Sequence, residues 1–197
     1  MLGMNEMILR ESESREVVQY AKSVEKAGNY LLSLINNILD ITRIESKKLD
    51  IIEEKFSLRQ LVQEVCLIGA KQAEAKNLEF VVDVEETLPK YLEGDALHIK
   101  QVILNLINNA VKYTKKGKVF LEVCQEEKQI SFSVKDTGIG IKKEDMEALF
   151  DMFMRADIKR HRNIEGSGLG LTIAKELCEQ MGGHIQAESI YGKGSNF

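Results

Sequence analysis

The chain has 197 residues, of which 44% are hydrophobic and 29% are charged, a composition typical of a globular protein and not of a disordered tail. Its formal net charge of −4 leaves no excess of basic residues for a nucleic acid partner. No apolar run is long enough to span a membrane, so no membrane contact is expected. Cys66, Cys124 and Cys178 are far apart and form no C-x-x-C pair, which favours reduced thiols and a cytoplasmic location.

The first 48 residues are expected to be helical. A short helix is predicted over 1–11, a polar turn over 12–14 and a long helix over 15–47. Apolar residues of the long helix alternate steps of three and four, the spacing of a coiled-coil seam: Val24, Ala27, Leu31, Leu34, Ile38 and Ile41. A helix this apolar is not stable alone in water, and the short helix cannot cover it. A second copy of the chain is therefore the expected partner, and packing against the rest of its own chain is the alternative.

From residue 49 onward the pattern predicts an α+β domain built as a two-layer sandwich. Strands are expected at 50–56, 79–84, 119–125, 130–135 and 185–189. Helices are expected at 57–76, from the cap Asp95 to about Tyr113, at 143–149 and at 169–181. Loops are expected at 85–93 and 151–165, and a glycine turn begins at Tyr191 and stops at Phe197.

The helix after Asp95 carries polar residues in a regular pattern. Asn105, Asn109 and Lys112 follow at spacings of four and three, which places them on one helix face. The apolar residues repeat on another face, which can face a core: Leu104, Ile107 and Val111. Buried amides need partners. The segment is therefore either an ordinary hydrogen-bonded helix on a sheet, or one whose Asn oxygen binds a hard cation while the Lys meets phosphates.

Two glycine motifs follow this helix. D-T-G-I-G-I, residues 136–141, comes directly after a strand, where a carboxylate can accept a hydrogen bond from an exocyclic amine such as that of adenine. G-S-G-L-G-L, residues 166–171, opens the last helix, whose free N–H groups suit a phosphate. Each could also be an ordinary glycine turn. The spacing fits neither a Rossmann fingerprint nor a P-loop.

Four features follow one another along the chain: the Asn-bearing helix, D-x-G-x-G-I, the pair Phe150 and Phe153, and G-x-G-L-G-L. In this order they resemble the N, G1, F and G2 boxes of sensor histidine kinases. These kinases share a Bergerat-type ATP-binding fold with type II topoisomerases, mismatch-repair ATPases and a heat-shock chaperone. Residues 31–48, L-L-S-L-I-N-N-I-L-D-I-T-R-I-E-S-K-K, resemble the second helix of the kinase dimerisation and phosphotransfer domain. The resemblance covers nearly the whole chain.

The resemblance implies that the chain binds ATP and Mg²⁺. Asn109 would bind the Mg²⁺ that bridges the phosphates, Lys112 would contact phosphate, Tyr113 would lie against adenine, and Asp136 would read its amino group. Residues 151–165 would form a lid, whose basic residues either add positive charge near the γ-phosphate or form a solvated loop: Arg155, Lys159, Arg160 and Arg162. The full set of implied ATP-binding residues is Asn105, Asn109, Lys112, Tyr113, Asp136, Gly138, Gly140, Ile141, Phe150, Arg155, Gly166, Ser167, Gly168, Leu169 and Gly170.

The chain departs from the family in its histidines. The family's phosphoacceptor is a His on the first dimerisation helix, and His98, His161 and His184 do not fit that place. His98 is expected to be exposed. We therefore expect a fragment: residues 1–48 as truncated dimerisation helices without the acceptor, and 49–197 as an ATP-binding domain that lacks its last strand. Any membrane anchor of the parent protein would lie in segments upstream.

The expected function is that of the ATP-binding catalytic core of a sensor histidine kinase. It would transfer the γ-phosphoryl of ATP to a histidine, for relay to the receiver domain of a response regulator, although the fragment itself is not expected to autophosphorylate. One alternative is a serine kinase of the anti-sigma type, which the long apolar helix disfavours. The other is a non-catalytic, nucleotide-regulated dimer, which the intact Asn109, Asp136 and glycines disfavour.

Overall fold

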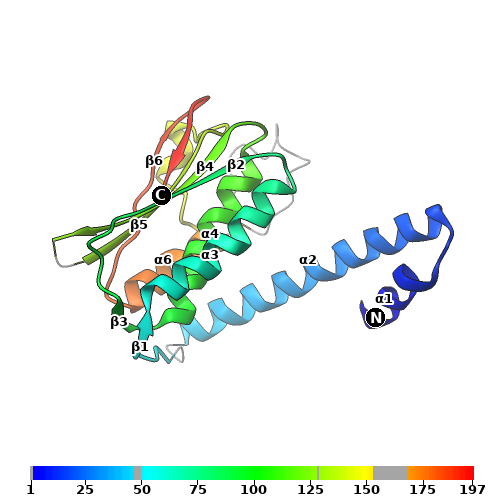
Figure 1. The fold of residues 1–197 in the computed structure, drawn as a ribbon, viewed down its shortest axis with the longest axis horizontal. Coiled ribbons are helices and arrows are strands. Elements are labelled where there is room, and N and C mark those ends of the chain that lie inside the picture. Colours follow the sequence, from blue (N-terminus) through cyan, green and yellow to red (C-terminus); the bar gives the residue numbers. More distant parts are fainter. Residues whose placement is uncertain (1, 47–49, 128, 153–167) are drawn as a thin grey trace. The chain divides into compact units, whose positions relative to one another are not determined.

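The computed structural model describes residues 2–46, 50–127, 129–152 and 168–197. The chain divides into two compact units, residues 1–49 and residues 50–197. The first unit is helical, and the second combines a sheet with helices (Figure 1). This is the α+β organisation with a preceding helical element that the sequence predicts.

The first unit is a pair of helices, α1 (Leu2–Glu11) and α2 (Arg15–Glu45). The two helices pack together, and the buried Asn5 donates from Nδ2 to the carbonyl oxygen of Ala21 at 2.8 Å. Among the described residues of this unit nothing covers the middle of the apolar stripe of α2, where Leu31 is 57% exposed. The stripe is therefore exposed within this unit, and a partner helix that covers it stays a prediction.

The second unit is built on a five-stranded sheet with the strand order β2-β4-β5-β7-β6. Its strands are β2 (Glu79–Val84), β4 (Lys118–Glu126), β5 (Gln129–Asp136), β6 (Glu188–Ile190) and β7 (Gly194–Asn196). β2 pairs with β4 in parallel, and the other pairs are antiparallel. Alternate residues of β4 point to one side of the sheet and are fully buried: Val119, Leu121 and Val123.

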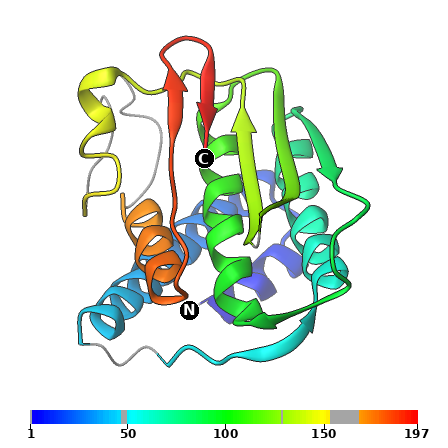
Figure 2. The ribbon, with the colours of Figure 1, turned by 90° about the vertical axis from the view of Figure 1, so that its left-hand side faces the viewer.

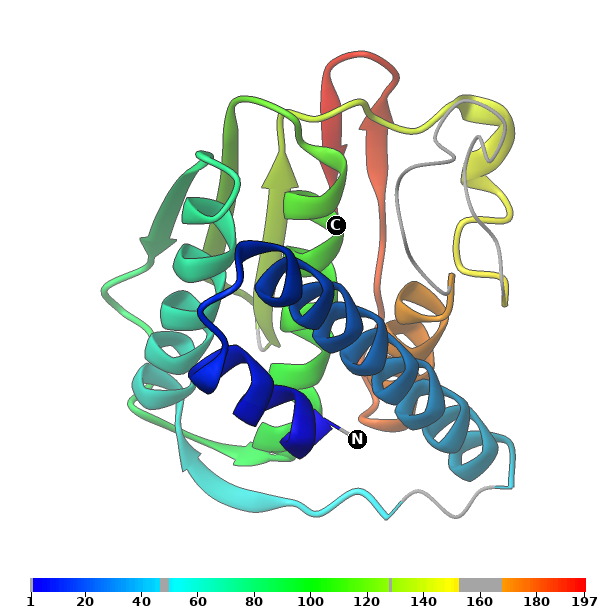
Figure 3. The ribbon, with the colours of Figure 1, turned by 90° about the vertical axis from the view of Figure 1, so that its right-hand side faces the viewer.

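Helices pack on that buried face. α4 (Ala96–Tyr113) lies between α3 (Leu58–Glu74) and α6 (Gly170–Gln180), as Figures 2 and 3 show from opposite sides. Ser57 caps α3 by accepting from the Gln60 amide at 3.3 Å, which is the N-cap role expected of a serine. The two layers bury Ile103 and Ile107 of α4 against the sheet, so the helix that carries the candidate site is the centre of the core.

A second, two-stranded sheet joins β1 (Glu54–Ser57) to β3 (Tyr91–Gly94) in antiparallel register. The strand predicted at 50–56 therefore begins only at Glu54, and the loop predicted at 85–93 ends in β3. Both strands have four residues, too few to show a clear alternation of apolar and polar positions. Each is a strand because of its distant partner, which sequence periodicity does not reveal.

The C-terminal region also differs from the prediction. The strand expected at 185–189 lies at 188–190, and the segment 191–197 contains β7, which inserts between β5 and β6. The reason is that β7 pairs with β5, where Asp136 faces Ser195, and that a tight hairpin joins it to β6, in which the Lys193 amide donates to the Ile190 carbonyl at 2.9 Å. The helix predicted at 143–149 is also shorter, since α5 spans only Lys143–Met146.

Candidate functional site

The polar face of α4 lies where its spacing predicts. Asn105, Asn109 and Lys112 are all partly buried on this helix. Asn105 donates from Nδ2 to the carbonyl oxygen of Gly170 at 3.3 Å, so its amide joins α4 to the first residue of α6. Of the three residues predicted to face the core, Ile107 and Val111 are buried. Leu104 is only partly buried, and Ile103 takes its place in the core.

The last turn of α4 brings a cation onto an aromatic ring. The Nζ atom of Lys112 lies 4.7 Å from the centroid of the Tyr113 ring, within the range of a cation–π contact. The next residue, Thr114, ends the helix in an extended conformation and is completely buried. Lys112 and Tyr113, the residues predicted to meet phosphate and adenine, are therefore already held beside each other.

Asp136 lies at the end of β5 and is only 5% exposed. Its Oδ1 accepts from the Gly138 amide at 2.7 Å. Burial raises the pKa of this carboxyl, while hydrogen bonds from the Gly138 and Ser195 backbone act to lower it. A buried carboxylate with a raised pKa is a frequent mark of a functional group, and this one adjoins the end of α4.

The D-x-G-x-G-I loop needs its glycines because other backbone packs against it. A Cβ at Gly138 would come within 2.6 Å of the Tyr113 carbonyl oxygen. Gly140 has a positive φ of 65°, and a Cβ there would come within 2.2 Å of the Ile190 carbonyl oxygen. The Ile139 amide donates to the Tyr113 carbonyl at 3.3 Å, which ties the loop to the end of α4.

Ile141 completes this loop on the side of the β6–β7 hairpin. Its amide donates to the Ser189 hydroxyl at 2.7 Å, and that hydroxyl in turn donates to the Gly194 carbonyl at 2.9 Å. The loop between Asp136 and Ile141 is therefore held at both ends, on one side by the hairpin and on the other by α4. A ligand that contacts Asp136 would meet a preformed backbone.

The start of α6 forms the third side of the site. Gly168 has a positive φ of 74°, Leu169 is 1% exposed, and no side chain among the described residues caps the helix that begins at Gly170. Such an uncapped N-terminus leaves N–H groups that suit an anion. The Thr172 hydroxyl donates to the Phe150 carbonyl at 2.9 Å and so attaches the segment after α5 to this helix.

Several predicted residues lie outside the part of the chain that the structure describes. They are Phe153, Arg155, Lys159, Arg160, His161, Arg162, Gly166 and Ser167. Residues 153–165 of the predicted lid at 151–165 also lie outside the described part, so the role of the lid stays a prediction.

The expectation that His98 is exposed is wrong. The side chain is 15% exposed, and its Nδ1 lies 2.7 Å from Oδ2 of Asp95. Asp95 also caps α4 through the His98 amide at 3.0 Å and accepts from the Ile52 amide at 3.0 Å. Although burial opposes it, these hydrogen bonds keep the pKa of Asp95 below its usual value. The ring is partly buried because the carboxylate that caps the helix also binds it, whereas His184 is exposed.

Sequence motifs did not single out Lys76, Thr114 or Thr172. Thr114 is adjacent to a predicted residue, and Thr172 follows the second glycine motif, so position alone could have suggested both. Lys76 donates from its ammonium to the carbonyl oxygens of Val111 and Lys112 at the end of α4. No sequence signal indicates this contact, because these residues lie 35 and 36 positions further along the chain.

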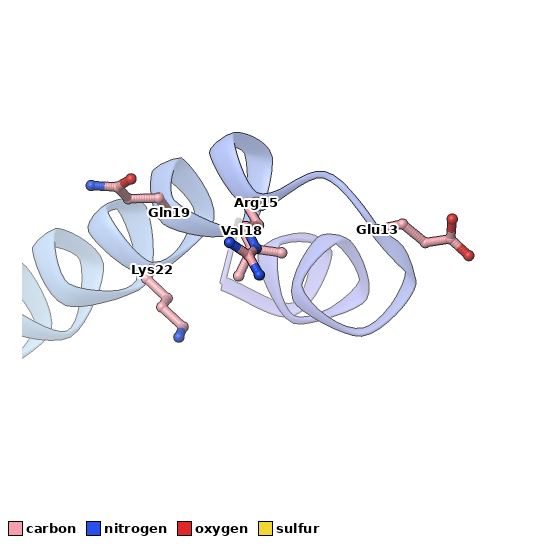
Figure 4. Close-up of a pocket in the computed structure, with 5 residues that line it drawn as sticks. All are labelled: Glu13, Arg15, Val18, Gln19 and Lys22. Carbon is pink, nitrogen blue, oxygen red and sulfur yellow. The ribbon is translucent and has the colours of Figure 1, made fainter.

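A hollow of about 330 Å³ lies in the first unit, away from these motifs in sequence. It is lined by Glu13, Arg15, Val18, Gln19 and Lys22. Figure 4 shows their side chains pointing in different directions, with Glu13 turned away from the other four. The hollow gathers no convergent polar groups and is not a candidate for the predicted site. Among the described helices, none is both long and apolar enough to cross a lipid bilayer.

The chain is similar to known proteins in sequence and in structure. Residues 94–197 match the family described as histidine kinase-, DNA gyrase B-, and HSP90-like ATPase. The chain is 40% identical over 201 residues to the sensor histidine kinase GacS of Pseudomonas protegens, a match that covers 100% of this chain and 22% of GacS. It is 37% identical over 184 residues to hybrid signal transduction histidine kinase B of Dictyostelium discoideum, covering 91% of this chain and 9% of that protein.

A solved structure is also similar over the whole chain. The crystal structure of full-length ShkA in complex with AMPPNP superposes with a TM-score of 0.82 at 28% identity, covering 100% of this chain and 41% of that one. The chain therefore belongs to the histidine kinase-, DNA gyrase B- and HSP90-like ATPase family. Within that family it is of the sensor histidine kinase type, and the residues that match the family, 94–197, lie in its second unit. It spans less than a quarter of the length of either curated relative.

Proposed function

We propose that this chain binds Mg-ATP and serves as the catalytic core of a histidine kinase. One observation carries the proposal: the two glycine motifs, which are distant in sequence, both contact α4, the helix that carries the Asn motif. Asn105 is bonded to Gly170 of the second glycine motif, and Tyr113 is bonded to Ile139 of the first. Asp136 lies beside the same helix end, since its Oδ1 accepts from the Gly138 amide and Gly138 packs against the Tyr113 carbonyl.

Adenine recognition is assigned to Asp136 and Tyr113. A carboxylate accepts from the amino group of adenine, whereas guanine presents a carbonyl oxygen at the same ring position and would be repelled. Tyr113 offers a ring face for the base, at a helix end that the Ile139 amide holds in place. ADP should therefore bind more tightly than GDP.

Phosphate binding is assigned to Lys112 and to N–H groups in the first turn of α6. The amide oxygen of Asn109 is a hard donor of the kind that Mg²⁺ accepts, and Mg²⁺ commonly takes few protein ligands and the rest from phosphates and water. When bound, the metal would neutralise charge on the phosphates. Asn105, which is engaged with Gly170, is better suited to holding the two helices together than to binding metal.

The reaction we propose is phosphoryl transfer to a histidine on a dimerisation helix. An imidazole nitrogen attacks the γ-phosphorus, the bond from phosphorus to the β,γ-bridging oxygen breaks, and ADP leaves with the electron pair of that bond. The domain contributes position and charge neutralisation. The phosphoryl group would then pass to an aspartate in the receiver domain of a response regulator.

The proposed partner of α2 is the same helix of a second copy, since the exposed stripe has coiled-coil spacing. A substrate such as ATP and three free cysteines favour a cytoplasmic setting for the domain.

Calorimetric titration with ADP, with and without Mg²⁺, tests the proposal. Wild-type protein should bind ADP more tightly when Mg²⁺ is present, and Asn109→Ala should remove most of that gain. Asn108→Ala is the matched control, because Asn108 is the exposed neighbour on another face of α4 and should bind as wild type does. A wild-type protein that does not bind ADP, or that binds it equally without Mg²⁺, would contradict the proposed function.

A further inference from the structure

The side chain of Lys76 reaches the end of the nucleotide-site helix from outside every recognised motif. Its ammonium donates to the carbonyl oxygen of Val111 at 2.9 Å and to that of Lys112 at 3.0 Å. Lys76 lies just after α3, so the contact crosses from one helix to the end of its neighbour.

The last four carbonyls of a helix have no partner within the helix and must find donors elsewhere. In α4, the carbonyl of Ala110 accepts from the Thr114 amide at 3.1 Å, and the carbonyl of Tyr113 accepts from the Ile139 amide at 3.3 Å. Lys76 supplies the donors for the two carbonyls in between. A cation at this position also suits the negative end of the helix dipole.

The backbone at Lys76 is itself held in place. Asn77 has a left-handed φ of 56°, its amide donates to the Glu74 carbonyl at 2.9 Å, and the Leu78 amide donates to the Ala73 carbonyl at 3.0 Å. This is the Schellman pattern that closes many helices. Because Leu78 and Ala73 are both buried, the turn is anchored in the core and delivers the Lys76 side chain to a defined place.

The contact lies next to the residues assigned to the ligand. Burial, and then the charge of Lys112, lower the pKa of Lys76, which agrees with two ammonium groups lying near each other. Lys112 and Tyr113 belong to the turn whose carbonyls Lys76 binds. Movement of this turn would shift both side chains and would stretch the bond between Tyr113 and Ile139, on which the position of the D-x-G-x-G-I loop depends.

We propose that Lys76 is a positioning residue of the nucleotide site. Its ammonium closes the C-terminal end of α4 and so sets the backbone that presents Lys112 and Tyr113 to the ligand. The inference rests on the proposed nucleotide binding and adds a residue that none of the glycine or Asn motifs contains.

The test compares Lys76→Met, Lys76→Arg and the control Lys71→Met by calorimetric titration with ADP and Mg²⁺. Met keeps the length of the side chain without a donor, and Arg can donate to two carbonyls at once. Lys71 is an exposed lysine in the last turn of α3. We expect the dissociation constant to rise about fivefold for Lys76→Met, the change that about 1 kcal/mol produces. Lys76→Arg should regain most of the affinity, and Lys71→Met should bind as wild type does.

Hydrogen exchange of the Thr114 and Ile139 amides in the ligand-free protein provides a second readout. Both should exchange faster in Lys76→Met and at the wild-type rate in Lys76→Arg. Unchanged ADP affinity in a folded Lys76→Met, or a Lys76→Arg variant as weak as Lys76→Met, overturns the inference. If wild type does not bind ADP, the proposed function fails. The exchange rates then decide the inference separately, and equal rates in wild type and Lys76→Met would refute it. If Lys76→Met does not fold, Lys76→Gln replaces it in both measurements.

Discussion

Replacement of Asp136 by Asn should have different effects on the affinity for adenine nucleotide and on the stability of the fold. The substitution keeps the shape of the side chain and leaves an oxygen that can accept from the Gly138 amide, as Oδ1 of Asp136 does at 2.7 Å. It removes the charge, and it places an NH₂ group where the second carboxylate oxygen would accept from adenine. The effect on the ligand and the effect on the fold should therefore have opposite signs.

The expected loss of affinity follows from the kind of contact removed. A hydrogen bond to a charged group contributes about 1.5–3 kcal/mol, which corresponds to a rise of about 10- to 150-fold in the dissociation constant for ADP. An amide NH₂ facing the amino group of adenine adds a repulsive contact. The upper part of this range is therefore the better expectation for Asp136→Asn.

The fold should not lose stability. Burial raises the pKa of Asp136 in spite of its hydrogen bonds, so its surroundings favour the neutral form over the charged one. The folded protein then binds more protons than the unfolded chain between the ordinary and the raised pKa, and its stability falls as the pH rises through that window. Asp136→Asn should remove this slope and be as stable as wild type, or more so, at neutral pH. Affinity of wild type for ADP should fall as the pH drops through the raised pKa, because a protonated carboxyl loses its charge.

Calorimetric titration with ADP and GDP, together with urea unfolding at several pH values, measures both effects. Asp83→Asn is the matched control, because Asp83 is exposed on β2 and should change neither quantity. Asp136→Asn that binds ADP as tightly as wild type would refute the adenine assignment. A large loss of stability together with the loss of binding would show that Asp136 acts mainly on the fold.

Two further predictions concern the first unit and the acceptor. Leu31→Glu should weaken self-association by at least about tenfold, since it places a charge in an exposed apolar stripe, while Ser33→Glu on the opposite face of α2 should not. Sedimentation over a concentration series measures this, and a wild-type protein that stays monomeric at high concentration would contradict the dimer. The 197-residue chain should take up no acid-labile label from γ-labelled ATP, because His98, His161 and His184 all lie outside α1 and α2. Acid-labile label mapped to one of these three histidines would require a different acceptor.

Local patterns in the sequence were enough to predict much of the fold. The period of apolar residues predicted α2 and α4, and the side chains of Ser57 and Asp95 predicted where two helices begin. The order of the Asn, Asp and glycine motifs predicted which segments would form the site. These features could be read because each depends on residues within a few positions of one another.

Contacts between distant residues could not be read in this way. β3 and β7 are strands because β1 and β5 lie beside them, His98 is partly buried because the capping Asp95 binds its ring, and Lys76 reaches α4 because α3 ends next to it. Each depends on the packing of elements that lie far apart in the sequence, and a side chain with several polar partners within reach does not reveal which one it will meet. The residue types of the proposed site were therefore chosen from the chain alone, and their roles stay predictions. The backbone contacts that hold them in place became visible only in the tertiary structure, because packing decides which groups lose water and must find each other.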